Sequence, residues 1–189
     1  MAVYNVTMKH SGETLEALSR MQYDLFCKRN RYARMIVSVC AITAGVVNYS
    51  QWWGILLIAY GCYLTTSIYS SSDRTAHKLA RQLKEAGLDF PESEYRFESG
   101  AMHIISLPEG KEDTEPLAYS RVHGMGEDGD YYYIFRNEYG GYMIPKPALG
   151  DRTQAFRDFI EKKTGKVFIN PKSPFRRALA FKRKFNIGR

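Results

Sequence analysis

Apolar side chains dominate residues 35–72, a run that contains no Asp, Glu, Lys, Arg or His. A polar cluster at 48–51 divides the run, which predicts two helices, about 33–47 and 52–69, joined by a short turn. About 20 apolar residues cross the hydrocarbon core of a bilayer, so the second helix fits and the first needs its flanking aromatic residues. We therefore predict a transmembrane helical hairpin; the alternative is a buried hairpin of a soluble protein.

Basic residues flank the apolar run on both sides, whereas its turn carries no charge. Positive charge near the ends of spanning helices marks the cytoplasmic side, so we expect a cell membrane protein with two transmembrane helices and both termini in the cytoplasm. A signal peptide is excluded because about thirty amphipathic residues precede the run. The aromatic residues at the helix ends are candidate membrane-interface anchors: Tyr32, Tyr49, Trp52 and Trp53.

Amphipathic segments surround the hairpin. Alternation over 3–8 predicts a strand, and Ser11 is a candidate N-cap for the helix that follows it. A second amphipathic helix is expected after the hairpin, ending at Gly87. From residue 93 the apolar period is two, which predicts antiparallel strands at 93–97, 101–107, 117–122, 131–136 and 141–145.

The last predicted helix is capped by Asp151 or Thr153 and ends at Gly165. Its expected buried residues are Ala155, Phe156, Phe159 and Ile160. The predicted fold class is α+β, a transmembrane hairpin with a small antiparallel β-roll and a C-terminal helix. The expected segments are a cytoplasmic strand and helix (1–31), the hairpin (32–70), a linker helix (71–88), the β-roll domain (89–170) and a tail (171–189).

Three short motifs after the hairpin carry a family resemblance. They are the aromatic strand 131–135, the run Tyr-Met-Ile-Pro-Lys with its strand end at Pro145 and Lys146, and the helix with Phe156 and Phe159. With the hairpin, this order resembles the YcxB-like family of bacterial membrane proteins, whose strand tryptophan is replaced here by Tyr119. The resemblance implies a pleckstrin-homology-like cytoplasmic domain, and it implies no activity.

The net charge of +7 is unevenly distributed. Residues 88–171 hold ten basic and fifteen acidic side chains, whereas 172–189 hold seven basic and no acidic ones. A nucleic-acid reader would carry a basic face on its folded part, so we expect no nucleic-acid partner. On a helical wheel the tail separates apolar from basic residues, which predicts binding to an anionic membrane leaflet; a solubilising or partner-binding tail is the alternative. The candidate residues are Arg176, Arg177, Lys182, Arg183 and Lys184.

Signatures of catalysis are absent from the sequence. The four histidines are scattered, and the three cysteines show neither disulfide nor zinc spacing. Gly124 and Gly126 lack the rest of a phosphate loop, and the acidic run 127–130 is expected to be a solvated hairpin turn rather than a cation loop. We expect no enzyme, cofactor or metal.

These observations predict a non-enzymatic, membrane-anchored interaction or regulatory module on the cytoplasmic face, with an unknown protein partner. Its negative domain disfavours direct contact with anionic headgroups. The alternative is an accessory subunit of a membrane transport or secretion complex that packs through its hairpin, and a homo-oligomer is compatible with both.

Overall fold

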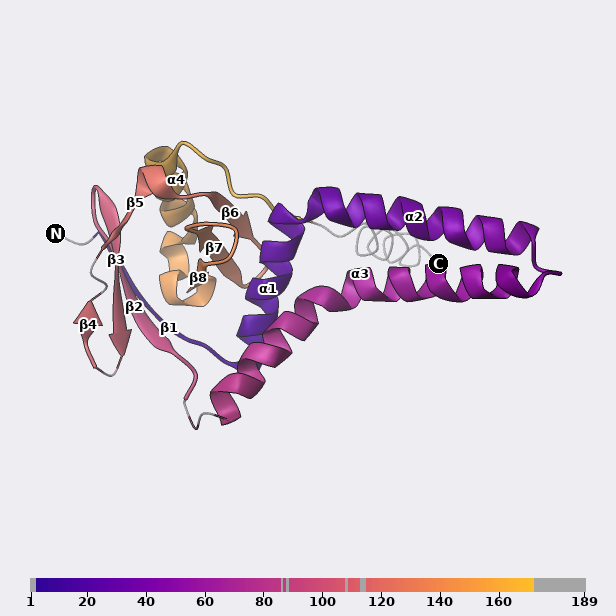
Figure 1. The fold of residues 1–189 in the computed structure, drawn as a ribbon. Helices are drawn as coiled ribbons and strands as arrows, with labels where there is room; N and C mark the ends of the chain where they lie inside the picture. Colours follow the sequence, from indigo (N-terminus) through magenta and orange to yellow (C-terminus); the bar gives the residue numbers. More distant parts are fainter. Residues whose placement is uncertain (1–2, 86, 88, 108, 113–114, 172–189) are drawn as a thin grey trace, which may run out of the picture. The chain divides into compact units, whose positions relative to one another are not determined.

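The computed structural model describes residues 3–85, 87, 89–107, 109–112 and 115–171. Two compact units make up the chain. The helical unit is His10–Phe90, and the α+β unit combines the first strand, up to Lys9, with the chain from Pro91 onward. Figure 1 traces both units along the sequence. The predicted basic tail, 172–189, lies outside the described residues.

Three helices form the helical unit: α1 (Gly12–Phe26), α2 (Lys28–Val47) and α3 (Trp52–Glu85). The predicted cap of α1 is confirmed, since Ser11 Oγ accepts the Thr14 N–H while Thr14 Oγ1 accepts the Ser11 N–H. The turn between α2 and α3 lies at 48–51, as predicted. The separate linker helix is wrong: α3 runs on to Glu85 because no Gly or Pro interrupts residues 62–85.

Neither α2 nor α3 reaches the combination of length and apolar character that a membrane crossing needs, and the same holds for every other helix in the described residues. The predicted transmembrane hairpin is therefore wrong, as are the fold class that included it and the localisation in a cell membrane with both termini cytoplasmic. Basic residues occupy the first turns of α2, and glycine, serine, threonine and tyrosine dilute the apolar residues of α3. The α+β character and the antiparallel sheets are observed.

Glycines set how closely α2 and α3 pack. A Cβ added at Gly54 would lie 2.1 Å from the Asn48 carbonyl oxygen, and one at Gly45 would lie 2.6 Å from the Gly54 carbonyl oxygen. A Cβ at Gly61 would lie 2.5 Å from Ile42 Cγ1. Only the absence of side chains allows the two backbones to approach this closely.

A hydroxyl pair joins the same two helices. Ser38, which is 2% exposed, donates to the Gly61 carbonyl oxygen at 2.7 Å. Its Oγ also lies 2.6 Å from Oγ1 of Thr65, which donates to the same carbonyl at 3.1 Å. The line of contact between α2 and α3, which we call the seam, thus combines glycines and hydroxyl groups with the side chains of Ile42 and Ile58.

The first sheet of the α+β unit pairs β1 (Tyr4–Lys9), β2 (Glu92–Phe97), β3 (Ala101–Leu107) and β4 (Lys111–Glu112) in that order, with β5 (Leu117–Ala118) also on β3. All pairings are antiparallel. The register aligns Val6, Tyr95 and Ile104 across the first three strands, and all three are buried.

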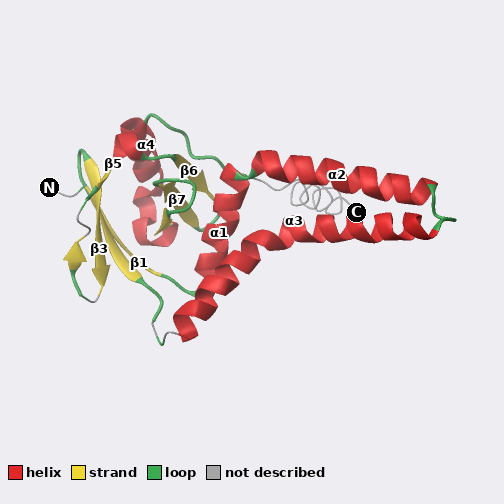
Figure 2. Ribbon diagram, in the orientation of Figure 1, coloured by secondary structure: helices red, strands yellow, loops and turns green. Residues whose placement is uncertain are grey.

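The second sheet has the order β6 (Gly124–Glu127), β7 (Tyr131–Phe135) and β8 (Gly141–Pro145). A 3₁₀ segment, η2 (Lys146–Arg152), then leads into α4 (Thr153–Thr164). Figure 2 shows the strands and helices by colour. A parallel bridge from Ile169 to Gly126 covers the outer edge of β6.

Most predicted strands are confirmed, with two kinds of error. The expected strand at 117–122 keeps only β5, because a 3₁₀ turn, η1 (Tyr119–Arg121), follows it. The strands β4 and β6 were missed; β6 contains two glycines, which have low strand propensity.

The predicted cap of α4 is wrong and its predicted end is right. Arg152 occupies the N-cap position without a side-chain bond, and the Thr153 hydroxyl donates to the Gly150 carbonyl instead. Gly165 ends the helix with φ at 66°, a left-handed conformation that glycine adopts without strain.

Phe156 of α4 joins the two sheets. Its ring packs edge-on against Tyr4 of β1 and Phe97 of β2, at centroid distances of 5.2 and 4.9 Å, and lies 5.6 Å from Tyr132 of β7. Phe156 and Ile160 are buried as predicted, whereas Ala155 is exposed and Phe159 is half-buried. The core of this unit therefore centres on aromatic contacts from α4.

We predict that Phe156→Ala lowers the free energy of unfolding by about 3–5 kcal/mol, because it removes a fully buried ring and leaves a cavity. Phe159→Ala is the matched control on the same helix and should cost clearly less. Denaturant titration of both variants measures this, and equal losses would contradict the central role of Phe156.

Gly54→Ala should destabilise the helical unit by about 1–3 kcal/mol through overpacking against the Asn48 carbonyl. Gly12→Ala is the control, because nothing lies within 4 Å of an added Cβ there and alanine favours α1. Shifts of the denaturation midpoint in opposite directions are expected; equal shifts would show that the seam tolerates a methyl group.

A pH effect should follow from His10. Burial lowers the pKa of this imidazole from 6.5, so unfolding below that pH takes up a proton that the folded state excludes. The stabilising contribution of neutral His10 is thus present above about pH 6.5 and is lost as the pH falls. Denaturant titrations across this range should give a smaller pH dependence for His10→Gln than for the parent chain; identical slopes would refute the assignment.

Candidate functional site

Lys146 directly follows β8, and its side chain is mostly buried and hydrogen-bonded to the protein. Its ammonium group donates to the Asp128 carbonyl oxygen at 2.6 Å and to Glu127 Oε2 at 3.4 Å. It also lies 4.6 Å from the centroid of the Tyr132 ring, within the range of a cation–π contact. The side chain is 19% exposed. β8 ends at Pro145, as the predicted strand 141–145 does, and the Lys146 side chain joins this end to the β6–β7 turn.

Arg157 extends these contacts onto α4. Its guanidinium lies 3.3 Å from Glu127 Oε1 and donates to Glu161 Oε1, also at 3.3 Å. Burial alone would lower the pKa of Arg157, but the two carboxylates raise it above the ordinary value. Glu161 Oε1 also accepts the Phe168 N–H at 2.9 Å. We call Glu127, Lys146, Arg157 and Glu161 the strand-end network.

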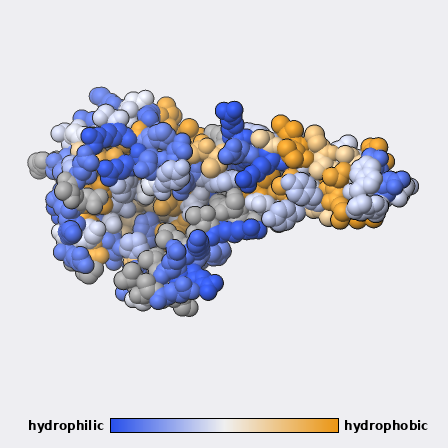
Figure 3. Space-filling view, viewed as in Figure 1, coloured by the Kyte–Doolittle hydropathy of each residue, from blue (hydrophilic) through white to orange (hydrophobic). Residues whose placement is uncertain are grey.

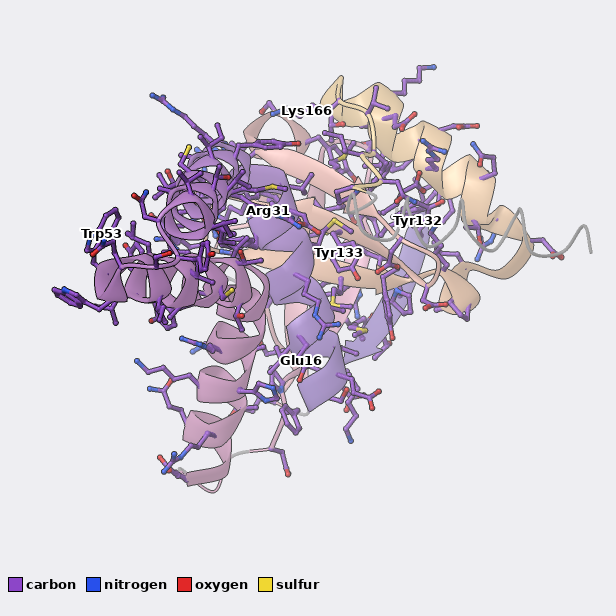
Figure 4. All side chains as sticks on the ribbon, turned by 90° about the vertical axis from the view of Figure 1, so that its right-hand side faces the viewer. Glu16, Arg31, Trp53, Tyr132, Tyr133 and Lys166 are labelled. Carbon is purple, nitrogen blue, oxygen red and sulfur yellow. The ribbon has the colours of Figure 1, made fainter. Side chains whose placement is uncertain are left out.

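Asp128 organises the turn between β6 and β7. Its Oδ1 accepts the backbone N–H groups of Asp130 and Tyr131, at 2.9 and 2.8 Å, and its Oδ2 accepts the Tyr133 hydroxyl at 2.5 Å. Burial, followed by the bond to Asp128, raises the pKa of Tyr133. Figure 4 labels Tyr132 and Tyr133 on β7. The predicted hairpin turn is confirmed, but its central carboxylate is bonded to the protein.

The strand-end network is internally paired. Each of its two cations contacts a carboxylate, and each carboxylate contacts a cation. Its groups therefore hold β8, the β6–β7 turn and α4 together, and they offer little spare hydrogen-bonding capacity for acid–base chemistry. No cluster of three or more metal-ligating side chains occurs among the described residues.

Glu127 and Arg157 were not identified from the sequence. Glu127 was assigned to a solvated turn, yet its side chain is 14% exposed. One signal was available: Arg157 and Glu161 are four residues apart, a spacing that places opposite charges together on a helix. The contact with Glu127 joins residues thirty positions apart in the chain and required the tertiary structure.

Large apolar side chains are exposed along α2, α3 and their turn. Figure 3 shows hydrophobic residues gathered over these two helices. Trp52 and Tyr49, near the turn, are 73% and 72% exposed. We call the full set the hairpin surface: Tyr32, Met35, Ile36, Val37, Val39, Val46, Val47, Tyr49, Trp52, Trp53, Ile55, Leu56, Tyr60 and Tyr63.

Several polar side chains on or beside the hairpin surface already hydrogen-bond to backbone carbonyls of the hairpin. The exposed hydroxyls of Thr43 and Thr66 donate to carbonyl oxygens of their own helices, Val39 at 2.9 Å and Cys62 at 3.0 Å. The Asn48 amide likewise donates to the Ala44 carbonyl oxygen. An apolar partner could therefore cover this surface without leaving these groups unsatisfied.

The predicted interface anchors all lie on the hairpin surface, at two places. Tyr49, Trp52 and Trp53 lie in or next to the turn, and Tyr32 lies in the first turns of α2. Figure 4 labels Trp53 on the outer part of the hairpin. Their anchoring role depended on the transmembrane hairpin and is not carried further. The five candidate basic residues of the tail, Arg176, Arg177, Lys182, Arg183 and Lys184, lie outside the described residues.

Comparison with known proteins bears on the α+β unit. No curated protein and no solved structure matches the chain. The pleckstrin-homology-like topology implied by the resemblance accordingly stays a prediction. A family model does match, over the stretch that runs from β3 into α4 and includes the strand end at Lys146. Residues 103–160 are thus similar to the YcxB-like protein family, as the sequence motifs predicted.

Proposed function

We propose that this protein is a non-enzymatic interaction module that binds a protein partner through its hairpin surface. The observation that carries the proposal is the exposure of many large apolar side chains on a segment, 35–72, without a single charged residue. Among the described residues of the α+β unit, by contrast, the exposed large hydrophobic residues are few: Val3, Tyr139, Val167 and Ile169.

The area involved supports a binding role. Aromatic side chains present about 150–250 Å² each, so the exposed parts of the six aromatic residues on the hairpin surface amount to roughly 700 Å². The largest apolar patch of a typical monomer is about 300–600 Å² and often functional. Leaving this surface in water would be costly, and covering it with apolar helices of a partner removes that cost.

The paired charges of the α+β unit also support this proposal. The strand-end network pairs its own charges, which favours a role in holding the β8 end and α4 in place over a role in catalysis. A rigid unit attached to an apolar hairpin suits a regulatory or accessory subunit. In this arrangement the hairpin supplies the contact, and the α+β unit supplies a second surface for regulation.

We predict that a photo-crosslinking benzophenone side chain in place of Tyr63 yields a discrete protein adduct in cells that naturally make the chain. The matched control is the same replacement of Tyr139, which is still more exposed, at 86% against 60%, but lies in the β7–β8 turn. Gel mobility and mass spectrometry measure the adducts, and we expect several-fold more at Tyr63. Equal yields at the two positions, or no adduct at Tyr63, would refute the proposal.

A further inference from the structure

We propose that the partner of the hairpin surface is a separate protein that encloses the hairpin in an apolar groove with acidic side chains at its mouth. This inference rests on the proposed function, and it names the chemistry of the partner. Two observations carry it. Large apolar side chains are exposed on opposite sides of each hairpin helix, and exposed cations lie beyond both ends of the charge-free segment 35–72.

Exposure on opposite sides of α2 and α3 calls for a partner that surrounds the hairpin. Successive residues are about 100° apart around a helix axis, so Met35 and Val37 lie on nearly opposite sides of α2. They are 47% and 52% exposed. On α3, Trp53 and Ile55 have the same spacing and are 39% and 62% exposed. A partner on a single face would leave one member of each pair in water, whereas a helix that is apolar on all sides is normally enclosed.

The exposed area suits a stable complex with an enclosing partner. A standard-size interface buries about 800 Å² on each partner. The exposed parts of the six aromatic residues on the hairpin surface already supply roughly 700 Å². The other apolar residues of the hairpin surface add to this area, and a groove that surrounds both helices can reach all of it.

Four exposed cations lie on the hairpin helices outside the charge-free segment. We call them the basic collar: Arg29, Arg34, Arg74 and Lys78. Within the described part of the chain no member of the collar forms an ion pair, whereas Arg31 contacts Asp24 and Arg81 contacts Glu85. Residues 28–34 and 73–81 together hold seven Lys or Arg and one acidic residue. The hairpin therefore presents uncompensated positive charge next to its apolar part.

The basic collar lies away from the turn. Gly45 lies opposite Gly54, and Gly61 lies opposite Ile42, so α2 and α3 are antiparallel and both ends of the charge-free segment are remote from 48–51. Figure 3 shows hydrophilic residues beside the hydrophobic ones at this end of the hairpin. Carboxylates at the mouth of the groove would meet the collar when the apolar part is inside. Complementary charges of this kind steer association and fix the orientation of a complex.

The spread of the collar favours carboxylates of a protein over a layer of anionic headgroups. At about 1.5 Å per residue, Arg34 lies about 20 Å along α2 from Val47, and Lys78 lies about 39 Å along α3 from Trp52. Measured along the helices, the collar extends over about 19 Å. A headgroup layer is only about 5–8 Å thick, whereas a protein can place a carboxylate beside each cation. A second hairpin of this chain would bring the same cations together.

Charge reversal tests the acidic mouth. In the full chain with benzophenone at Tyr63, Arg34→Glu combined with Arg74→Glu should lower the yield of protein adduct in cells several-fold, because carboxylates would then face carboxylates. Arg34→Lys combined with Arg74→Lys keeps both charges and should retain the yield. The control is Lys111→Glu combined with Lys162→Glu, two exposed positions of the α+β unit that give the same change in net charge. An unchanged yield after reversal, or an equal fall in the lysine or control variant, would refute the acidic mouth.

A carbodiimide identifies the groups that face the collar, because it joins an amine to a carboxylate directly with loss of water. In extracts of the same cells, the Arg34→Lys variant should be coupled at position 34 or at Lys78 to the protein captured at Tyr63, through an Asp or Glu of that protein. Lys162 is the control in the same digest and should stay uncoupled to it. Capture at Tyr63 without coupling at either position would contradict the proposed contact.

Two further benzophenone positions test the enclosure. Met35 and Val37 are similarly exposed and lie on nearly opposite sides of α2. Each, replaced in turn, should give an adduct with the protein captured at Tyr63. An adduct at only one of the two positions would show that the partner covers a single face.

The outcomes separate this inference from the proposed function. A Tyr63 adduct that withstands charge reversal overturns the acidic groove and leaves the interaction module standing. An adduct with the mass of two copies of this chain likewise overturns the separate partner alone. A parent chain that forms no protein adduct at Tyr63, or an adduct with phospholipid only, overturns both.

Discussion

The close approach of α2 and α3 is the constraint on which the proposed activity depends. Gly45, Gly54 and Gly61 leave no room for a side chain at the seam, and Ser38 fills the remaining space with a hydroxyl that bonds across it. The space left by the glycines is occupied by the facing backbone and by Ile42 and Ile58, whereas many other large apolar side chains of both helices are exposed. The hairpin therefore combines a closely packed contact between its helices with the exposed apolar surface to which we assign the binding role.

The α+β unit is held together by aromatic contacts between its two sheets and α4. Its two antiparallel sheets are joined by Phe156, which contacts Tyr4, Phe97 and Tyr132 from both sheets. The strand-end network joins α4 to the β6–β7 turn through Arg157 and Glu127. Many of the described aromatic residues of this unit are buried in its core, whereas six aromatic residues of the hairpin are exposed. That difference is why we assign the binding role to the hairpin.

Predictions from the sequence pattern were correct where interactions between neighbouring residues determine the structure. The N-cap at Ser11, the turn at 48–51, the strands at 101–107 and 141–145, and the end of α4 at Gly165 were all predicted from a few neighbouring residues. The predictions were wrong where apolar and polar residues of one helix favour different environments. The apolar run predicted a transmembrane hairpin, but basic residues at the start of α2 and polar residues within α3 leave both helices short of that requirement.

The sequence by itself determined most of the helices and strands and several of their ends, because caps, turns and periodicity act over a few residues. It also determined the resemblance to the YcxB-like family over 103–160, since the motifs are local strings. Only the tertiary structure decided that Glu127 pairs with Lys146 and Arg157, and that the glycines of the hairpin face one another. Those contacts join residues far apart in the chain, and their geometry depends on how whole elements pack.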